Sequence, residues 1–109
     1  MANTTPRLIG QNKPDAAVNT NLFTVTTGNQ VQFSLFVCNQ GDDIDQFTVA
    51  LIPAGEPESL NSYIAYRTPL LGHGVFAASG LYLNSGDQVL VESLNGFVSF
   101  TATGIEITP

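Results

Sequence analysis

The sequence predicts an all-β fold: an antiparallel β-sandwich, jelly-roll-like or immunoglobulin-like, of seven to eight strands with an extended N-terminal arm. From residue 20 onward, apolar and polar residues alternate with period two. Turn-forming residues recur at intervals of about 8–14 residues, and no helical periodicity extends beyond one turn. We therefore expect an arm over residues 1–19 and a β-sandwich domain over residues 20–109.

The first 19 residues have the composition of an extended arm. They include Pro6 and Pro14, few apolar residues, and a net charge of +1, whereas residues 20–109 carry −7. Ordering a chain costs roughly 1–2 kcal/mol per residue, so we expect this arm to be held by strand-like pairing with a sheet edge or with a neighbouring subunit. The predicted protein-contact residues of the arm are Arg7, Leu8, Ile9 and Lys13.

Two alternating segments lie in the first half of the predicted sandwich. Residues 30–38 place Val31, Phe33, Leu35 and Val37 on one face, and residues 45–52 repeat the pattern. The polar stretch between them, residues 39–43, has the composition of a turn, which predicts a hairpin.

A second hairpin is predicted near the C-terminus. Residues 88–92 and 97–103 flank Asn95-Gly96, a pair that tolerates the positive φ angles of a type I′ turn. Gly104 then interrupts the last strand, as a bulge or a close backbone approach would. The apolar faces predict a core that contains Phe33, Val49, Val91 and Phe100.

The chain is acidic but carries little charge. Its net charge is −6, and only 11% of its residues are charged, against roughly 25% in an ordinary soluble domain. With three basic residues there is no phosphate-neutralising patch, so we expect no nucleic-acid partner. Neutral polar groups desolvate more cheaply than charges, which favours a surface covered by other subunits; the alternative is an unusually neutral monomer.

No membrane partner is expected. Residues 1–11 lack the apolar stretch of a signal peptide, and no run approaches the ~20 apolar residues of a membrane span.

The residues that could carry catalysis are few. The single cysteine, Cys38, ends an apolar strand and is predicted to be buried, and the single histidine, His73, lies between two glycines in a predicted loop. Glu56 and Glu58 lie two residues apart in a proline-containing loop and do not form a facing acid/base pair. We therefore expect no enzyme activity and no cofactor.

Three acidic residues in one turn leave one metal alternative open. Asp42, Asp43 and Asp45 offer the hard oxygen ligands that calcium prefers, although the turn lacks the register of a calcium-binding loop. The preferred interpretation is a solvated acidic turn that discourages aggregation between strands.

Several short motifs resemble small virion structural proteins of tailed bacteriophages, particularly those that infect cyanobacteria. The matching stretches are residues 19–25 (NTNLFTV), 38–39 (CN), 63–66 (YIAY), 83–89 (LNSGDQV) and 96–108 (GFVSFTATGIEIT). The resemblance covers residues 19–108, and the arm falls outside it. It implies a β-sandwich subunit of a head or tail without catalytic residues.

The sequence and the resemblance together predict a non-enzymatic virion protein. We expect a capsid decoration or cement subunit, assembled in the host cytoplasm, whose partners are copies of itself as a trimer or dimer and a major capsid or tail protein. The alternatives are a tail, baseplate or fibre component, or a carbohydrate-binding module that uses loops 53–62 and 68–74 near Tyr63 and Tyr66.

Overall fold

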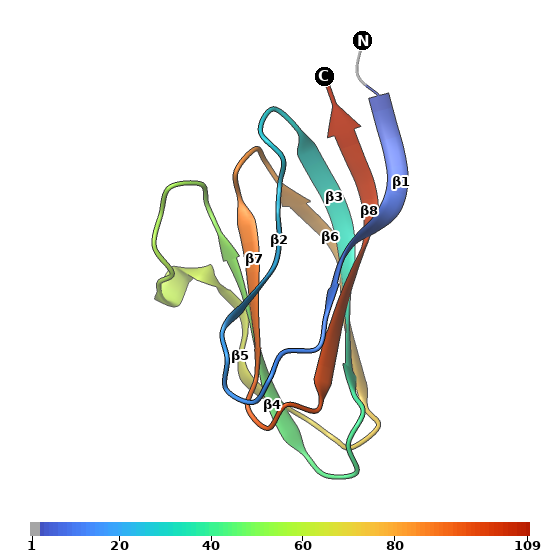
Figure 1. The fold of residues 1–109 in the computed structure, drawn as a ribbon, viewed down its shortest axis with the longest axis vertical. Helices are drawn as coiled ribbons and strands as arrows, with labels where there is room; N and C mark the ends of the chain where they lie inside the picture. Colours follow the sequence, from blue (N-terminus) through green and yellow to red (C-terminus); the bar gives the residue numbers. More distant parts are fainter. Residues whose placement is uncertain (1–2) are drawn as a thin grey trace.

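The structure, a computed structural model, describes residues 3–109 and shows eight strands and one short 3₁₀ helix. The elements are β1 (Asn3–Asn12), β2 (Thr20–Thr24), β3 (Gln30–Asn39), β4 (Asp45–Ile52), η1 (Leu60–Ser62), β5 (Tyr63–Leu70), β6 (Val75–Leu83), β7 (Gln88–Ser93) and β8 (Val98–Thr108). They form two four-stranded antiparallel sheets that face each other (Figure 1). We call the sheet with strand order β1-β8-β3-β6 sheet A and the sheet with order β2-β7-β4-β5 sheet B.

The strand order is that of a jelly roll. Strand β4 pairs with β5, β3 with β6, β2 with β7 and β1 with β8, so the chain folds back on itself as one long double ribbon. Winding that ribbon into two layers adds the β3–β8 and β4–β7 pairs. The predicted all-β sandwich is confirmed, and its topology is the jelly roll and not the immunoglobulin arrangement.

The core lies between the sheets and is built from the inward face of each alternating strand. Phe33 is 2% exposed, and Val49, Val91 and Phe100 are completely buried, which confirms the predicted core residues. The Phe47 ring packs against both Phe100 and Phe76, so aromatic contacts join the two layers.

Both predicted hairpins are wrong in their pairing, although the strands themselves exist. Strands β3 and β4 lie in different sheets, as do β7 and β8, so each of these turns crosses from one layer to the other. Of the Asn95-Gly96 pair, only Gly96 has a positive φ, 84°, whereas a type I′ turn needs two such residues. Turn composition shows where a strand ends, but it does not say which sheet the next strand joins.

The N-terminal segment pairs along a sheet edge, one of the two contacts predicted for the arm. Residues 3–12 form β1, an edge strand of sheet A that pairs with β8 from Asn3↔Thr108 to Asn12↔Phe100. An edge strand tolerates proline and needs few apolar residues, so its composition resembles that of an unpaired arm. Met1 and Ala2 of the predicted arm lie outside the described residues.

Gly104 confirms the predicted close backbone approach. A Cβ atom at this position would lie 2.1 Å from the backbone oxygen of Gln32 on the neighbouring strand, so no larger residue fits there without movement of the backbone.

Candidate functional site

The outer face of sheet A presents only uncharged side chains. Residues that pair across neighbouring strands share a face, so one outward row runs from Tyr82 through Gln32 and Ile105 to Pro6. The register gives this face the side chains of Thr4, Pro6, Leu8, Gln11, Gln30, Gln32, Ser34, Phe36, Cys38, Val75, Ala77, Tyr82, Ser99, Thr101, Thr103, Ile105 and Ile107. None of these residues is charged. We call this set the neutral face.

Large apolar side chains are exposed on the neutral face. Leu8 is 50% exposed, Phe36 45%, Val75 66% and Tyr82 55%. Four strands about 4.8 Å apart and about ten residues long cover about 600 Å².

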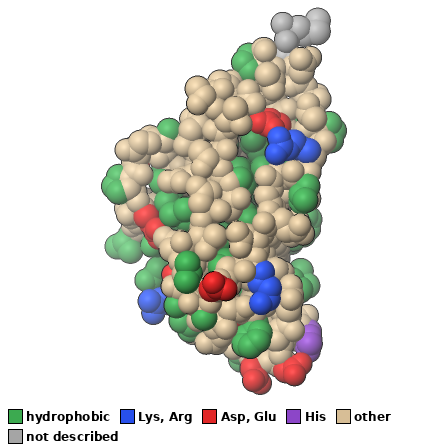
Figure 2. All heavy atoms as spheres, viewed as in Figure 1, with side chains coloured by type: hydrophobic (Ala, Val, Ile, Leu, Met, Phe, Trp, Pro, Cys, Tyr) green, Lys and Arg blue, Asp and Glu red, His purple; other side chains and the backbone are tan. Residues whose placement is uncertain are grey.

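Cys38, predicted to be buried, is half-buried here, because it lies on the outward side of β3. Two charged residues of sheet A, Arg7 and Glu106, lie on the opposite register from the neutral face, and the other charged residues belong to loops or to sheet B. Figure 2 shows scattered charged side chains, with one acidic and one basic side chain side by side near the top.

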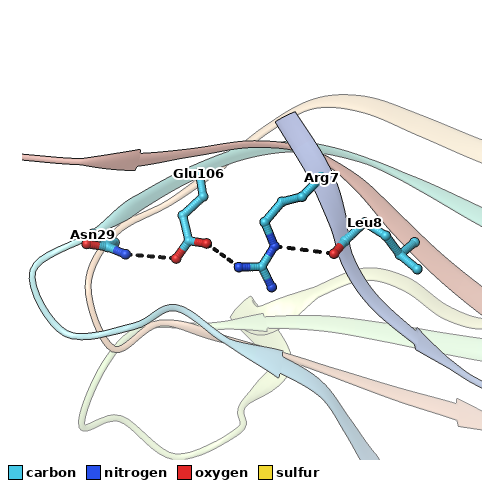
Figure 3. Close-up of polar contacts among 4 residues, drawn as sticks. All are labelled: Arg7, Leu8, Asn29 and Glu106. Carbon is cyan, nitrogen blue, oxygen red and sulfur yellow. Dashed lines mark hydrogen bonds and ion pairs between the residues drawn. The ribbon is translucent and has the colours of Figure 1, made fainter. Parts of the chain in front are cut away.

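Arg7, a predicted contact residue, is engaged within the chain. Its Nη1 donates to Glu106 Oε1 and its Nε donates to the Leu8 carbonyl oxygen, at 3.3 Å (Figure 3). Asn29 Nδ2 donates to the other carboxylate oxygen of Glu106, at 2.8 Å. This network joins β1 to β8 and to the β2–β3 loop, so Arg7 helps to hold the edge strand in place.

The other three predicted contact residues lie in three different environments. Leu8 is half-exposed on the neutral face, whereas Ile9 packs partly against the core. Lys13 Nζ donates to the Gly96 carbonyl oxygen at 2.8 Å and lies 6.0 Å from the centre of the Phe97 ring. The contact of these residues with another protein stays a prediction.

The three aspartates of the β3–β4 turn do not gather. Asp42 is exposed, and its Oδ1 lies 2.8 Å from His73 Nε2. Asp45 points into the fold, where it is 1% exposed. Within residues 3–109, no three His, Cys, Asp or Glu side chains form a cluster that could hold a metal ion.

Asp45 and Ser93 form a buried polar network that sequence reasoning missed. The Asp45 carboxylate accepts hydrogen bonds from Ser93 Oγ and from the backbone N–H groups of Gln46, Asn95 and Phe97, at 2.7–3.2 Å. Ser93 Oγ in turn accepts from the N–H groups of Gly96 and Val98. The network holds the turn that takes the chain from β7 in sheet B to β8 in sheet A, and β8 contributes residues to the neutral face.

Sheet B carries a different surface, around the exposed end of β5. The rings of Tyr63 and Tyr66 lie 4.6 Å apart, and the Arg67 guanidinium lies 5.8 Å from the centre of the Tyr66 ring. Glu58 accepts hydrogen bonds from Tyr63 Oη at 2.6 Å and from Asn19 Nδ2 at 2.8 Å. Arg67 has a φ of 46°, a strained value for a residue with a Cβ. We call Glu58, Tyr63, Tyr66 and Arg67 the tyrosine cluster.

The tyrosine cluster predicts a measurable pH dependence. The hydrogen bond to Glu58, then desolvation and the negative charge of Glu58, raise the pKa of Tyr63 from 10.0 to about 12. Since the folded state favours the neutral phenol, this contribution to stability is complete below pH 10.0 and is lost as the pH rises towards about 12. Tyrosinate absorbance measured against pH, and compared between the wild type and Tyr63→Phe, identifies the titration of Tyr63. We expect Glu58→Gln to lower the pKa of Tyr63. An unchanged pKa in this variant would contradict the role given to Glu58.

Comparisons with known proteins give a likeness of fold. No protein-family model matches the chain, and no curated protein matches it. A chain in the solved structure of the infectious bursal disease virus Gx strain is similar, with a TM-score of 0.53 and 10% sequence identity. The alignment covers 97% of this chain and 31% of that chain. A second similar chain, from the infectious bursal disease virus VP2 subviral particle, has a TM-score of 0.48, 12% identity, and coverages of 97% and 32%.

The likeness therefore concerns the jelly-roll fold. The chain spans about a third of the length of the solved chains that it resembles. Among the residues that the structure describes, no helix is long and apolar enough to cross a membrane.

Proposed function

We propose that this chain is a non-enzymatic structural subunit of a virus particle, and specifically a decoration or cement subunit on the head of a tailed bacteriophage. In this role it binds a major capsid protein and neighbouring copies of itself through protein–protein contacts. A tail, baseplate or fibre position is the runner-up within the same class.

The neutral face carries this proposal. Specific protein interfaces bury about 800 Å² per partner, and their centres are depleted in charge and contain aromatic residues. The neutral face has a projected area of about 600 Å², includes Phe36 and Tyr82, and has no charged side chain. Burying it requires no desolvation of an ion, which is the costly step at an ordinary protein surface.

Two further observations favour a virion. The motifs of residues 19–108 resemble phage virion proteins, and a chain of similar fold forms part of a solved virus structure. A subunit that binds only the assembled shell stabilises the shell by mass action, and repeated copies multiply that effect. The jelly roll supplies a rigid layer behind the neutral face, so little ordering is needed on binding.

The test uses particles purified from infected cells and shells stripped of this chain. We expect the chain to be present at a fixed ratio to the main shell protein, and its addition to stripped shells to raise their disassembly temperature. Phe36→Lys should weaken this binding by about tenfold or more, because it places an unpaired charge in a desolvated contact. Ile64→Lys changes a similarly exposed side chain on sheet B and is the matched control.

Particles that lack the chain, or equal binding by Phe36→Lys and the wild type, would contradict the proposal. Equal weakening by both lysine variants would show that the contact does not depend on the neutral face.

The tyrosine cluster supports a second candidate function, carbohydrate binding at a host surface. Aromatic rings with a few fixed polar groups beside them are typical of ligand sites, and Glu58 is held in place by two donors. Titration with host polysaccharide tests it: saturable binding that Tyr66→Ala abolishes would support a binding module. A subunit that functions only in a lattice should show no saturable binding.

A further inference from the structure

The four edge strands of the sandwich are protected to different degrees. An unpaired edge strand can pair with another chain, and natural proteins block this with proline, charge, irregular backbone or short length. Edge strand β1 contains Pro6 and Arg7 and a register shift between Leu8 and Gly10. Edge strand β5 contains Arg67, Pro69 and two register shifts, and β2 has only five residues.

Strand β6 lacks two of these devices, proline and charge. It has nine residues, none of them charged and none proline, and it pairs with β3 on one side only. Its one irregularity lies between the Phe33↔Leu81 and Leu35↔Ala78 pairs, next to Gly80 with a φ of 73°. The segment Val75–Ala78 is in regular register with β3, and Val75 is 66% exposed. A regular, uncharged edge is therefore open at this segment.

We propose that the Val75–Ala78 edge of β6 pairs antiparallel with the same edge of a second copy, about a two-fold axis at Ala77. The two copies of sheet A then form one continuous eight-stranded sheet. An antiparallel pair of identical strands is self-complementary, so one surface supplies both halves of the contact.

The charge distribution makes this edge a place where a second copy can approach, and the self-complementary pairing makes that copy the occupant. Each chain has a net charge of −6, so two copies repel each other wherever their acidic residues approach. At β6 the approaching residues are uncharged, and so is the adjoining neutral face. Pairing at this edge also doubles the area of the neutral face, from about 600 to about 1,200 Å².

This pairing uses the backbone edge of sheet A, and it is independent of which protein covers the neutral face. It can therefore be tested on the isolated chain. The first measurement is sedimentation velocity across a concentration series at micromolar to millimolar protein. We expect a concentration-dependent dimer for the wild type, and Ala77→Lys should weaken dimerisation by about tenfold, because it brings two like charges together across the axis.

Disulfide trapping gives a second readout that does not depend on a disruptive variant. In a Cys38→Ser background, Ala77→Cys should form a covalent dimer on oxidation, whereas Ile64→Cys on edge strand β5 should stay monomeric. Thermal melts of each variant show that the sandwich is folded. A monomeric wild type, a dimer that Ala77→Lys leaves intact, or equal trapping at both cysteine positions would overturn the proposal.

Discussion

Replacing Phe100 with alanine is expected to lower the free energy of unfolding by about 3–5 kcal/mol, a large part of the 5–15 kcal/mol typical of a small domain. Phe100 is completely buried and lies on β8, which pairs with both β1 and β3, so the cavity would open beneath a central strand of sheet A. Its ring centre lies 6.3 Å from that of Phe47 on sheet B, and this contact between layers would also be lost.

Urea unfolding of Phe100→Ala measures the effect. The matched control is Phe36→Ala on the outward side of β3, where the side chain is 45% exposed. We expect the control to change stability by roughly 0.5 kcal/mol or less. Equal midpoints for the two variants would show that the inward and outward faces of sheet A are assigned the wrong way round.

Replacing Asp45 with alanine is expected to cost about 3 kcal/mol or more. The Asp45 carboxylate accepts four hydrogen bonds, three of them from backbone N–H groups, and these donors would be left without a partner away from water. Because two of the donors, Asn95 and Phe97, belong to the β7–β8 turn, their amide hydrogen exchange should accelerate as well.

Asp43→Ala is the control for Asp45→Ala, since Asp43 belongs to the same acidic turn and is exposed. We expect Asp43→Ala to leave both the thermal midpoint and the exchange of Asn95 nearly unchanged. If the two aspartate variants have the same thermal midpoint, Asp45 does not organise the crossing between the sheets.

The alternating pattern predicts strands well because burial of one face imposes period two directly on the sequence. Residues 45–52 form β4 with the predicted bounds, and β3 extends only one residue beyond the predicted segment. The pattern does not predict which strands pair, because the partners of β3 are β6 and β8, far along the chain. Local turn composition at residues 39–43 and 93–96 cannot distinguish a hairpin from a crossing between layers.

Asp45 shows why the polar network escaped prediction. In the sequence it is one of three neighbouring aspartates, and composition favours a solvated turn for all three. Its burial depends on the β7–β8 turn, 50 residues away, which supplies the N–H donors. Its place at the first position of β4, just before an alternating segment, is the only local sign that it differs from Asp42 and Asp43.

The sequence predicts that an uncharged surface exists, but it does not predict where on the fold that surface lies. The low charge content indicates a surface that other subunits cover, and that is a property of composition alone. Its location requires the register, because the neutral face combines residues from β1, β8, β3 and β6. The N-terminal segment contributes Pro6 and Leu8 to it, and the sequence leaves open whether this segment pairs with its own sheet or with a neighbouring subunit.

Two tyrosines of the same chain allow the most direct test of the neutral face. Tyr82 lies on the neutral face and is 55% exposed, and Tyr66 lies on sheet B and is 54% exposed. Hydroxyl-radical footprinting of the free chain and of the chain in the intact particle compares the two side chains in one sample. We predict that assembly protects Tyr82 from oxidation and leaves Tyr66 reactive. Protection of Tyr66 with Tyr82 still fully reactive would contradict the assignment of the neutral face as the surface that binds the particle.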